Sequence, residues 1–241
     1  MTADAPSEIF QREGWLRIPR LVGAQTLDSL RRATAALESV AAEFEHDTTL
    51  CGVDFEVQSA SGRKGERAVA PGALRKITFP SKGQAAFMRL RRDERVTAVL
   101  EEIGLRSPVC LVDQVNFKLP RVGTGFPFHQ DASFLISKTR ERIDRDGGAN
   151  LVLALDAADA GNGGFEVLGR THRGGLVEFA YDTSGMNEGV FDETHRAVVA
   201  LEPGDAVLFH PGLAHGSGPN RSDRPRRMAT LWFVGAPAAT G

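Results

Sequence analysis

The chain has 241 residues, of which 41% are hydrophobic and 25% charged, and its formal net charge is −2. This composition excludes a largely disordered chain, and the charge gives no general attraction to nucleic acid or to an anionic membrane. Two cysteines cannot build a disulfide framework, the first residues are polar and acidic, and no apolar run reaches the roughly 20 residues that span a bilayer. We therefore expect a soluble cytoplasmic protein; its oligomeric state is left open.

The N-terminal part begins with a short strand predicted at residues 15–18. Apolar residues then recur at helical spacing and predict a helix over residues 26–44. The residues of this stripe are Leu27, Leu30, Ala33, Leu37 and Val40. Residues 46–72 are polar and contain glycine, which favours a long loop. Two shorter helices are expected at residues 84–90 and 94–103.

After residue 105 the pattern changes to short apolar or alternating runs separated by Gly, Pro, Asn and Asp, which is typical of an all-β barrel or sandwich. The runs cover residues 109–119, 151–156, 164–168, 198–201, 206–209 and 228–234. Two polar stretches, about 133–148 and 180–196, interrupt them and are candidate lid loops. We expect a single domain, 1–241, in which a helical N-terminal layer (1–105) covers a β core (106–241).

The six histidines carry the first indication of chemistry. Only His129 has a carboxylate two positions later, Asp131. Residues i and i+2 of an extended chain point to the same side, so both could reach one cation. By itself this pair is weak, because a satisfied surface pair would look the same.

A second histidine, His215, follows a Gly204-Asp205 turn and the apolar run 206–209. Strands far apart in sequence can become neighbours in a jelly roll, so His215 could complete the site. Two imidazoles and one carboxylate form the facial triad of non-haem Fe(II) oxygenases, which leaves coordination positions open for a cosubstrate and dioxygen. We therefore predict that His129, Asp131 and His215 are both metal ligands and catalytic residues.

Arg226 opens the last strong predicted strand, eleven residues beyond His215. The distal carboxylate of a chelating 2-oxo acid needs a buried cation, and a planar guanidinium suits that task. Arg224 and Arg227 are the competing candidates, and we prefer Arg226 on its spacing. On the expected strand, Arg226 shares one face with Thr230 and Trp232.

A polar stripe runs along the strand that precedes the metal motif. Gln114, Asn116 and Lys118 have one parity, whereas Val115 and Phe117 have the other. Within a β core such a stripe faces either solvent or a polar cavity. Because it leads towards His129, we interpret it as the lining of a cavity.

Taken in order, these segments resemble the phytanoyl-CoA dioxygenase family of 2-oxoglutarate oxygenases. The resemblance covers about 112–233 and rests on Pro127-Phe-His-Gln-Asp131, Asn162-Gly163-Gly164 with Thr171-His172-Arg173, and His215 through Arg226. It implies a mainly β fold, a double-stranded β-helix of the jelly-roll or cupin-like type. It also implies Fe(II), 2-oxoglutarate and dioxygen as cofactor and cosubstrates, with Ser217 and Arg226 holding the distal carboxylate and Gln114 or Lys118 as further contacts.

Two departures from the family pattern affect only the expected shape of the pocket. Gly169-Arg170 stands where the family usually has Pro-Gly, and Val152 occupies a place where a tryptophan is common. Asp131 is retained, whereas halogenating relatives have a small residue there, so halogenation is not expected.

The resemblance implies oxidation of an unactivated C–H bond of a small organic substrate, in bacterial secondary metabolism such as antibiotic biosynthesis. Hydroxylation, desaturation, epimerisation and cyclisation are all compatible with it. One alternative is a cupin-like metal-binding protein without turnover. Another is a metal-dependent dioxygenase that uses no 2-oxoglutarate, in which Arg226 would be dispensable.

Overall fold

The computed structural model describes residues 4–177 and 191–236, and within them the strands form two sheets. The larger sheet has eight strands in the order β1-β10-β7-β12-β5-β4-β3-β2, and the smaller has the order β6-β11-β8-β9. The strands of the larger sheet are β1 (Trp15–Ile18), β2 (Thr48–Leu50), β3 (Val53–Val57), β4 (Leu74–Thr78), β5 (Val109–Lys118), β7 (Gly148–Ala154), β10 (Ala206–Phe209) and β12 (Arg226–Val234). Those of the smaller sheet are β6 (Phe126–His129), β8 (Phe165–Leu168), β9 (Arg196–Val199) and β11 (His215–Ser217). This is the strand-rich, two-sheet jelly-roll fold that the sequence predicts.

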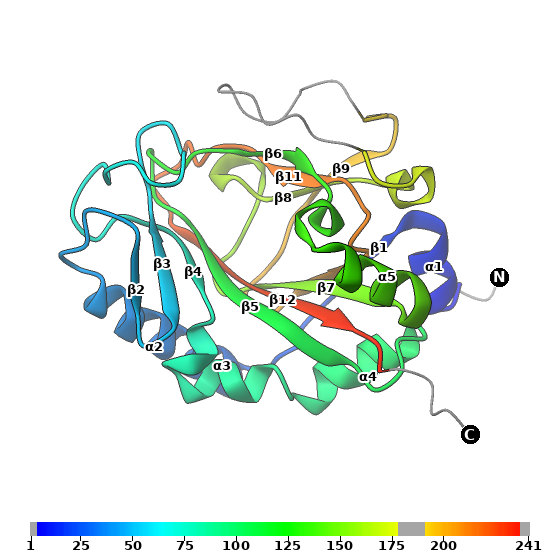
Figure 1. The fold of residues 1–241 in the computed structure, drawn as a ribbon. Helices are drawn as coiled ribbons and strands as arrows, with labels where there is room; N and C mark the ends of the chain where they lie inside the picture. Colours follow the sequence, from blue (N-terminus) through cyan, green and yellow to red (C-terminus); the bar gives the residue numbers. More distant parts are fainter. Residues whose placement is uncertain (1–3, 178–190, 237–241) are drawn as a thin grey trace.

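In the described part of the chain, five α-helices accompany the sheets, and three of them cover the outer face of the larger sheet, as Figure 1 shows. The five helices are α1 (Pro6–Glu13), α2 (Ala24–Val40), α3 (Ala85–Leu90), α4 (Glu94–Glu102) and α5 (Ser137–Asp146), with short 3-10 turns η1 (Pro80–Lys82), η2 (Asp131–Phe134), η3 (Ala160–Asn162) and η4 (Thr171–Gly174). In Figure 1, α2, α3 and α4 lie along one face of this sheet and the smaller sheet lies on the other. None of the described helices is both long and apolar enough to cross a membrane.

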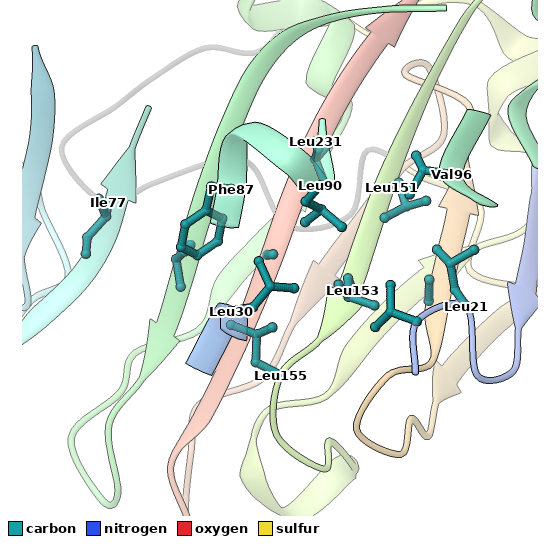
Figure 2. Close-up of a cluster of buried hydrophobic side chains, with 14 of the residues drawn as sticks. Leu21, Leu30, Ile77, Phe87, Leu90, Val96, Leu151, Leu153, Leu155 and Leu231 are labelled. Carbon is teal, nitrogen blue, oxygen red and sulfur yellow. The ribbon is translucent and has the colours of Figure 1, made fainter. Parts of the chain in front are cut away.

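The main core lies between these helices and the larger sheet. In Figure 2, Leu30 of α2, Leu90 of α3 and Leu231 of β12 belong to one cluster of buried side chains. A second apolar cluster fills the space between the two sheets and includes Phe165, Phe209 and Met228. The faces of β12 therefore alternate: Leu231 packs against the helices, while Met228 points into the space between the sheets.

Several boundaries differ from the sequence prediction. Strand β1 lies at the predicted residues 15–18, but the predicted helical layer, residues 1–105, also supplies β2 to β4, and β2 and β3 lie inside the stretch 46–72 that the sequence favoured as a loop. Helix α2 ends at Val40, which is exposed, and α1 was not predicted. Strand β2 was missed because it is largely exposed and has no buried face to generate an apolar pattern, whereas β3 alternates apolar and acidic residues and was overlooked.

The two expected lid loops have different outcomes. Residues 133–148 are not a loop, since they contain the end of η2 and the whole of α5. Only Ile143 of α5 is buried, so the helix has no apolar stripe that would have revealed it. In the other stretch, 180–196, residues 180–190 lie outside the described residues, and strand β9 begins at Arg196.

Candidate metal centre

The three predicted ligands meet in the space between the sheets. His129 is the last residue of β6, Asp131 begins η2, and His215 begins β11. Because β6 and β11 pair antiparallel with His129 opposite His215, the two imidazoles are neighbours. Asp131 Oδ1 lies 3.5 Å from His129 Nε2 and 3.6 Å from His215 Nε2.

Backbone carbonyl groups orient both imidazole rings. His129 Nδ1 is 2.8 Å from the carbonyl oxygen of Pro127, and His215 Nδ1 is 3.0 Å from that of Leu213. A carbonyl oxygen can only accept, so each Nδ1 carries the proton and donates it. In a neutral imidazole this leaves the Nε2 lone pair free, and both Nε2 atoms are the ones near Asp131.

Burial and hydrogen bonding set the protonation states that a metal requires. Burial lowers the pKa of His215 from 6.5 to about 4, so its imidazole is neutral at pH 7. Burial alone would raise the pKa of Asp131, but the adjacent His215 and His129 and a hydrogen bond from Asn150 bring it below its usual range. Asn150 Nδ2 donates to Asp131 Oδ2 at 2.6 Å, which leaves Oδ1 to the side of the imidazoles.

These three donors fit a 2-His-1-carboxylate iron site. The three ligand atoms all lie within 4.8 Å of one another, and no other such group of His, Cys, Asp or Glu occurs in the described parts of the chain. Aromatic rings surround His215, with ring centroids 4.6 Å away at Phe209 and 5.4 Å away at Phe165. Two bare imidazole nitrogens and one oriented carboxylate are the donor set that non-haem Fe(II) oxygenases use.

Arg226 is the buried cation that the sequence predicted, at the start of β12. Its exposure is 3%, and its Nε is buried without a hydrogen-bond partner among the described residues. Burial lowers the pKa of Arg226 to about 9. A buried guanidinium is costly unless an anion pairs with it, and the distal carboxylate of 2-oxoglutarate would be such an anion.

The two competing arginines are already paired. Arg227 binds both carboxylate oxygens of Asp156, at 2.8 and 3.0 Å, and also reaches Glu38. Arg224 is exposed and donates to Asp159 at 2.6 Å. Among the three candidates, Arg226 is therefore the one with capacity for a ligand.

The polar stripe on β5 lies opposite Thr230, Met228 and Arg226 of β12, and its members differ in what they contact. Gln114 is half-buried and lies opposite Thr230 of β12, whose hydroxyl accepts a 3.0 Å hydrogen bond from Asn116. Lys118 lies opposite Arg226, but its ammonium donates to the carbonyl oxygens of Thr124 (2.8 Å), Ser217 (3.3 Å) and Gly218. Lys118 thus ties the end of β5 to the end of β11.

Ser217 lies on β11 two residues beyond His215, opposite Phe126 of β6. It is only half-buried, and its carbonyl oxygen is one of the three that accept a hydrogen bond from Lys118. Ser217 therefore contacts Lys118, and Lys118 lies directly opposite Arg226 in the pairing of β5 with β12.

Sequence reasoning missed Asn150, which holds the metal-binding carboxylate. The only sequence feature that could have indicated this role is that Asn150 is a polar residue in the otherwise apolar strand β7. Two other histidines, His172 and His210, pack against each other with ring centroids 5.3 Å apart. They line a separate cavity of about 310 Å³ with Phe10 and Leu105, so they do not join the triad.

The comparisons with known proteins agree with this geometry. The family model described as Phytanoyl-CoA dioxygenase (PhyH) matches residues 10–228. Phytanoyl-CoA dioxygenase domain-containing protein 1 of Danio rerio is 23% identical over 265 residues, covering 96% of this chain and 89% of that protein.

Solved structures share the fold. EvdO2 from Micromonospora carbonacea var. aurantiaca, complexed with 2-oxoglutarate, is 25% identical, with 99% of this chain and 93% of that one covered and a TM-score of 0.67. The epimerase SnoN, in complex with Fe3+, alpha ketoglutarate and nogalamycin RO, is 17% identical, with coverages of 95% and 82% and a TM-score of 0.68. With the matched family model and the convergent triad, the chain belongs to the phytanoyl-CoA dioxygenase family of Fe(II)- and 2-oxoglutarate-dependent oxygenases.

Proposed function

We propose that this oxygenase acts on an unactivated C–H bond of a small organic substrate, in the cytoplasm of a bacterium and in secondary metabolism such as antibiotic biosynthesis. The observation that carries the use of 2-oxoglutarate is Arg226, a buried guanidinium whose Nε lacks a partner among the described residues. A metal-binding protein without a cosubstrate would have no use for this costly group.

Each site residue then has a distinct role. His129, Asp131 and His215 hold the iron, and Asn150 keeps one oxygen of Asp131 turned towards it. Iron and 2-oxoglutarate, when bound, would supply the oxidising chemistry: one oxygen atom of dioxygen would enter succinate as carbon dioxide leaves, and the other would end as a hydroxyl group on the substrate or as water. Arg226 and the hydroxyl of Ser217 hold the distal carboxylate of 2-oxoglutarate.

The proposed roles of Gln114 and Lys118, the two remaining predicted contacts of 2-oxoglutarate, depend on the groups around them. Gln114 lines the cavity on the same face of β5 as Asn116. Lys118 is a weaker candidate for direct contact with 2-oxoglutarate, because three backbone carbonyl groups already accept hydrogen bonds from its ammonium. We propose that it positions Ser217 instead.

The biological setting rests on likeness to SnoN and EvdO2. SnoN is described as an epimerase bound to nogalamycin, and EvdO2 as a 2-oxoglutarate complex from Micromonospora. Hydroxylation, desaturation, epimerisation and cyclisation all remain open for this chain. Cys51 and Cys110 are free thiols, which supports a reducing compartment. Pairing of β1 with β10 supports treating 1–241 as a single oxygenase domain.

An anaerobic titration of the metal-free protein with Fe(II) and 2-oxoglutarate tests the proposal without knowledge of the substrate. Chelation of iron by the 2-oxo acid should produce a weak visible metal-to-ligand charge-transfer band. The band should be absent in His215→Ala and require far more 2-oxoglutarate in Arg226→Met. His210→Ala is the matched control, since this histidine is half-buried, follows β10 and lies outside the triad, and it should keep the band.

Two results would contradict the proposal in different ways. If iron binds but no band forms at any 2-oxoglutarate concentration, the chain is a cupin-like binding protein or another type of metalloenzyme. If the band forms and titrates normally in Arg226→Met, 2-oxoglutarate binds but the assignment of Arg226 is wrong. Substrate-dependent succinate formation that is lost in Asp131→Ala would then be the test of turnover.

A further inference from the structure

Gln130 stands between two of the metal ligands but points away from them. On an extended backbone its side chain faces opposite to His129 and Asp131. It is fully buried, with 0% exposure. A buried amide must find hydrogen-bond partners, and those of Gln130 lie far from it in the sequence.

Within the described residues, the Gln130 side chain makes three hydrogen bonds, and all three go to backbone groups. Gln130 Nε2 donates to the carbonyl oxygen of Gly212 at 2.7 Å and to that of Gly175 at 2.9 Å. Its Oε1 accepts from the backbone N–H of Val177 at 2.8 Å. Both amide hydrogens are thus used, on two different segments, which is the full donor capacity of the side chain.

The first segment is the turn that leads into His215. Gly212 precedes Leu213, whose carbonyl oxygen orients the imidazole of His215. A second bond fixes this turn to the metal motif, since the N–H of Ala132 donates to the carbonyl oxygen of Pro211 at 2.9 Å. Gln130 and Ala132 therefore set the position of His215 relative to Asp131.

The second segment, residues 175–177, follows η4 and contacts the metal motif through Gln130. The Gln130 amide group binds both residues: its N–H donates to the carbonyl oxygen of Gly175, and its oxygen accepts from the N–H of Val177. Any displacement of this segment must therefore move the amide, and with it the backbone between His129 and Asp131.

We propose that Gln130 is a positioning residue that holds the two halves of the metal site in register and couples the segment 175–177 to metal binding. This inference rests on the proposed metal site. Outer partners of metal ligands commonly change metal affinity by about 10–100-fold when they are removed. Coupling is reciprocal, so metal binding must in turn stabilise the hydrogen bond at Val177.

Co(II) provides an optical probe of affinity and geometry that needs no cosubstrate. Gln130→Leu removes all three hydrogen bonds, and Gln130→Glu keeps an acceptor for Val177 but turns an oxygen towards a carbonyl group. Gln58 is the matched control: its exposure is 1%, and its Nε2 donates to the carbonyl oxygen of Ser59 at 2.7 Å. Gln58 Nε2 also donates to the hydroxyl of Thr124 at 3.3 Å, so Gln58→Leu and Gln58→Glu should lower Tm in the same way, and neither change touches a metal ligand.

We expect both Gln130 variants to weaken Co(II) binding about tenfold or more and to change its visible spectrum, at temperatures where circular dichroism shows them folded. Both Gln58 variants should bind Co(II) within about twofold of the wild type. Equal Co(II) affinities and spectra in all of these proteins would overturn the positioning role. A wild-type protein that binds no Co(II) would overturn the metal site itself and this inference with it.

Amide hydrogen exchange gives a second measurement that needs no variant. Loading the wild-type protein with diamagnetic Zn(II) should slow exchange at the Val177 amide, because opening of 175–177 must then also disturb the occupied site. The slowing should be lost in Gln130→Leu and kept in Gln58→Leu. An exchange rate at Val177 that is indifferent to Zn(II) in the wild type would refute the coupling, even if the Gln130 variants failed to fold.

Discussion

Replacing Arg226 by methionine should separate ligand binding from stability. The pKa of Arg226 falls from 12.5 to about 9 on burial, which corresponds to roughly 5 kcal/mol of lost solvation. In the ligand-free protein no carboxylate among the described residues forms an ion pair with Arg226 to offset that cost. Replacing a buried ion pair by apolar residues of similar volume is often neutral or stabilising by about 1–4 kcal/mol, and Arg226 without ligand lacks even the attraction of such a pair.

The same substitution should greatly weaken 2-oxoglutarate binding. Removing one partner of a buried ion pair costs about 3–5 kcal/mol, and each 1.4 kcal/mol is roughly a tenfold change in Kd. Arg226→Met should therefore bind 2-oxoglutarate at least about 100-fold more weakly. Its free energy of unfolding without ligand should equal or exceed that of the wild type.

Arg227→Met is the matched control, because it is the adjacent residue on the same strand with the opposite role. It loses the paired contacts to Asp156 and Glu38, so we expect about 2 kcal/mol of destabilisation with a 2-oxoglutarate Kd within about twofold of the wild type. Urea unfolding measures the stabilities, and the anaerobic charge-transfer titration measures the Kd. If Arg226→Met were strongly destabilised but bound 2-oxoglutarate normally, Arg226 would be a structural residue and the reasoning would fail.

Three further predictions concern the surroundings of the site. Asn150→Ala should weaken Fe(II) binding about 10–100-fold in an anaerobic chelator competition, because Asp131 loses its orienting hydrogen bond; an unchanged Kd would contradict this role. Without metal, the free energy of unfolding should fall as the pH drops from 6.5 to 4. Burial lowers the pKa values of His210 and His215 to about 4, so over that interval the unfolded chain binds protons that the folded chain does not. Each of these two histidines contributes on the order of 3 kcal/mol, and burial also lowers the pKa of His172, so His210→Phe should reduce the slope in urea titrations without abolishing it; a flat profile in the wild type would refute the argument. Lys118→Met leaves carbonyl groups of Thr124, Ser217 and Gly218 without their donor and should cost at least about 2 kcal/mol. Lys76→Met loses one partly buried ion pair and leaves Glu56 paired with Arg75, so it should cost less.

The sequence by itself was sufficient for the type of site and for most of the elements. The spacing of His129 and Asp131 fixes a shared direction on an extended chain, whatever the rest of the fold does. The alternation along β12 likewise predicts that Arg226 and Thr230 face one way and Leu231 the other, because side-chain direction in a strand has a period of two. Such statements depend only on local geometry, which is why they could be made without coordinates.

Tertiary structure decided everything that depends on pairing between distant segments. Only the register of β6 with β11 brings His215 opposite His129, and only the positions of Asp156 and Glu38 show that Arg227 is already paired. Lys118 illustrates the limit most clearly. Parity correctly places it on the same face of β5 as Gln114 and Asn116, but the carbonyl groups that it binds come from residues 124, 217 and 218, whose approach no local sequence pattern indicates. Hydrogen-bond partners of a buried polar group are set by the packing of the whole chain, whereas the direction of a side chain is set by its own strand.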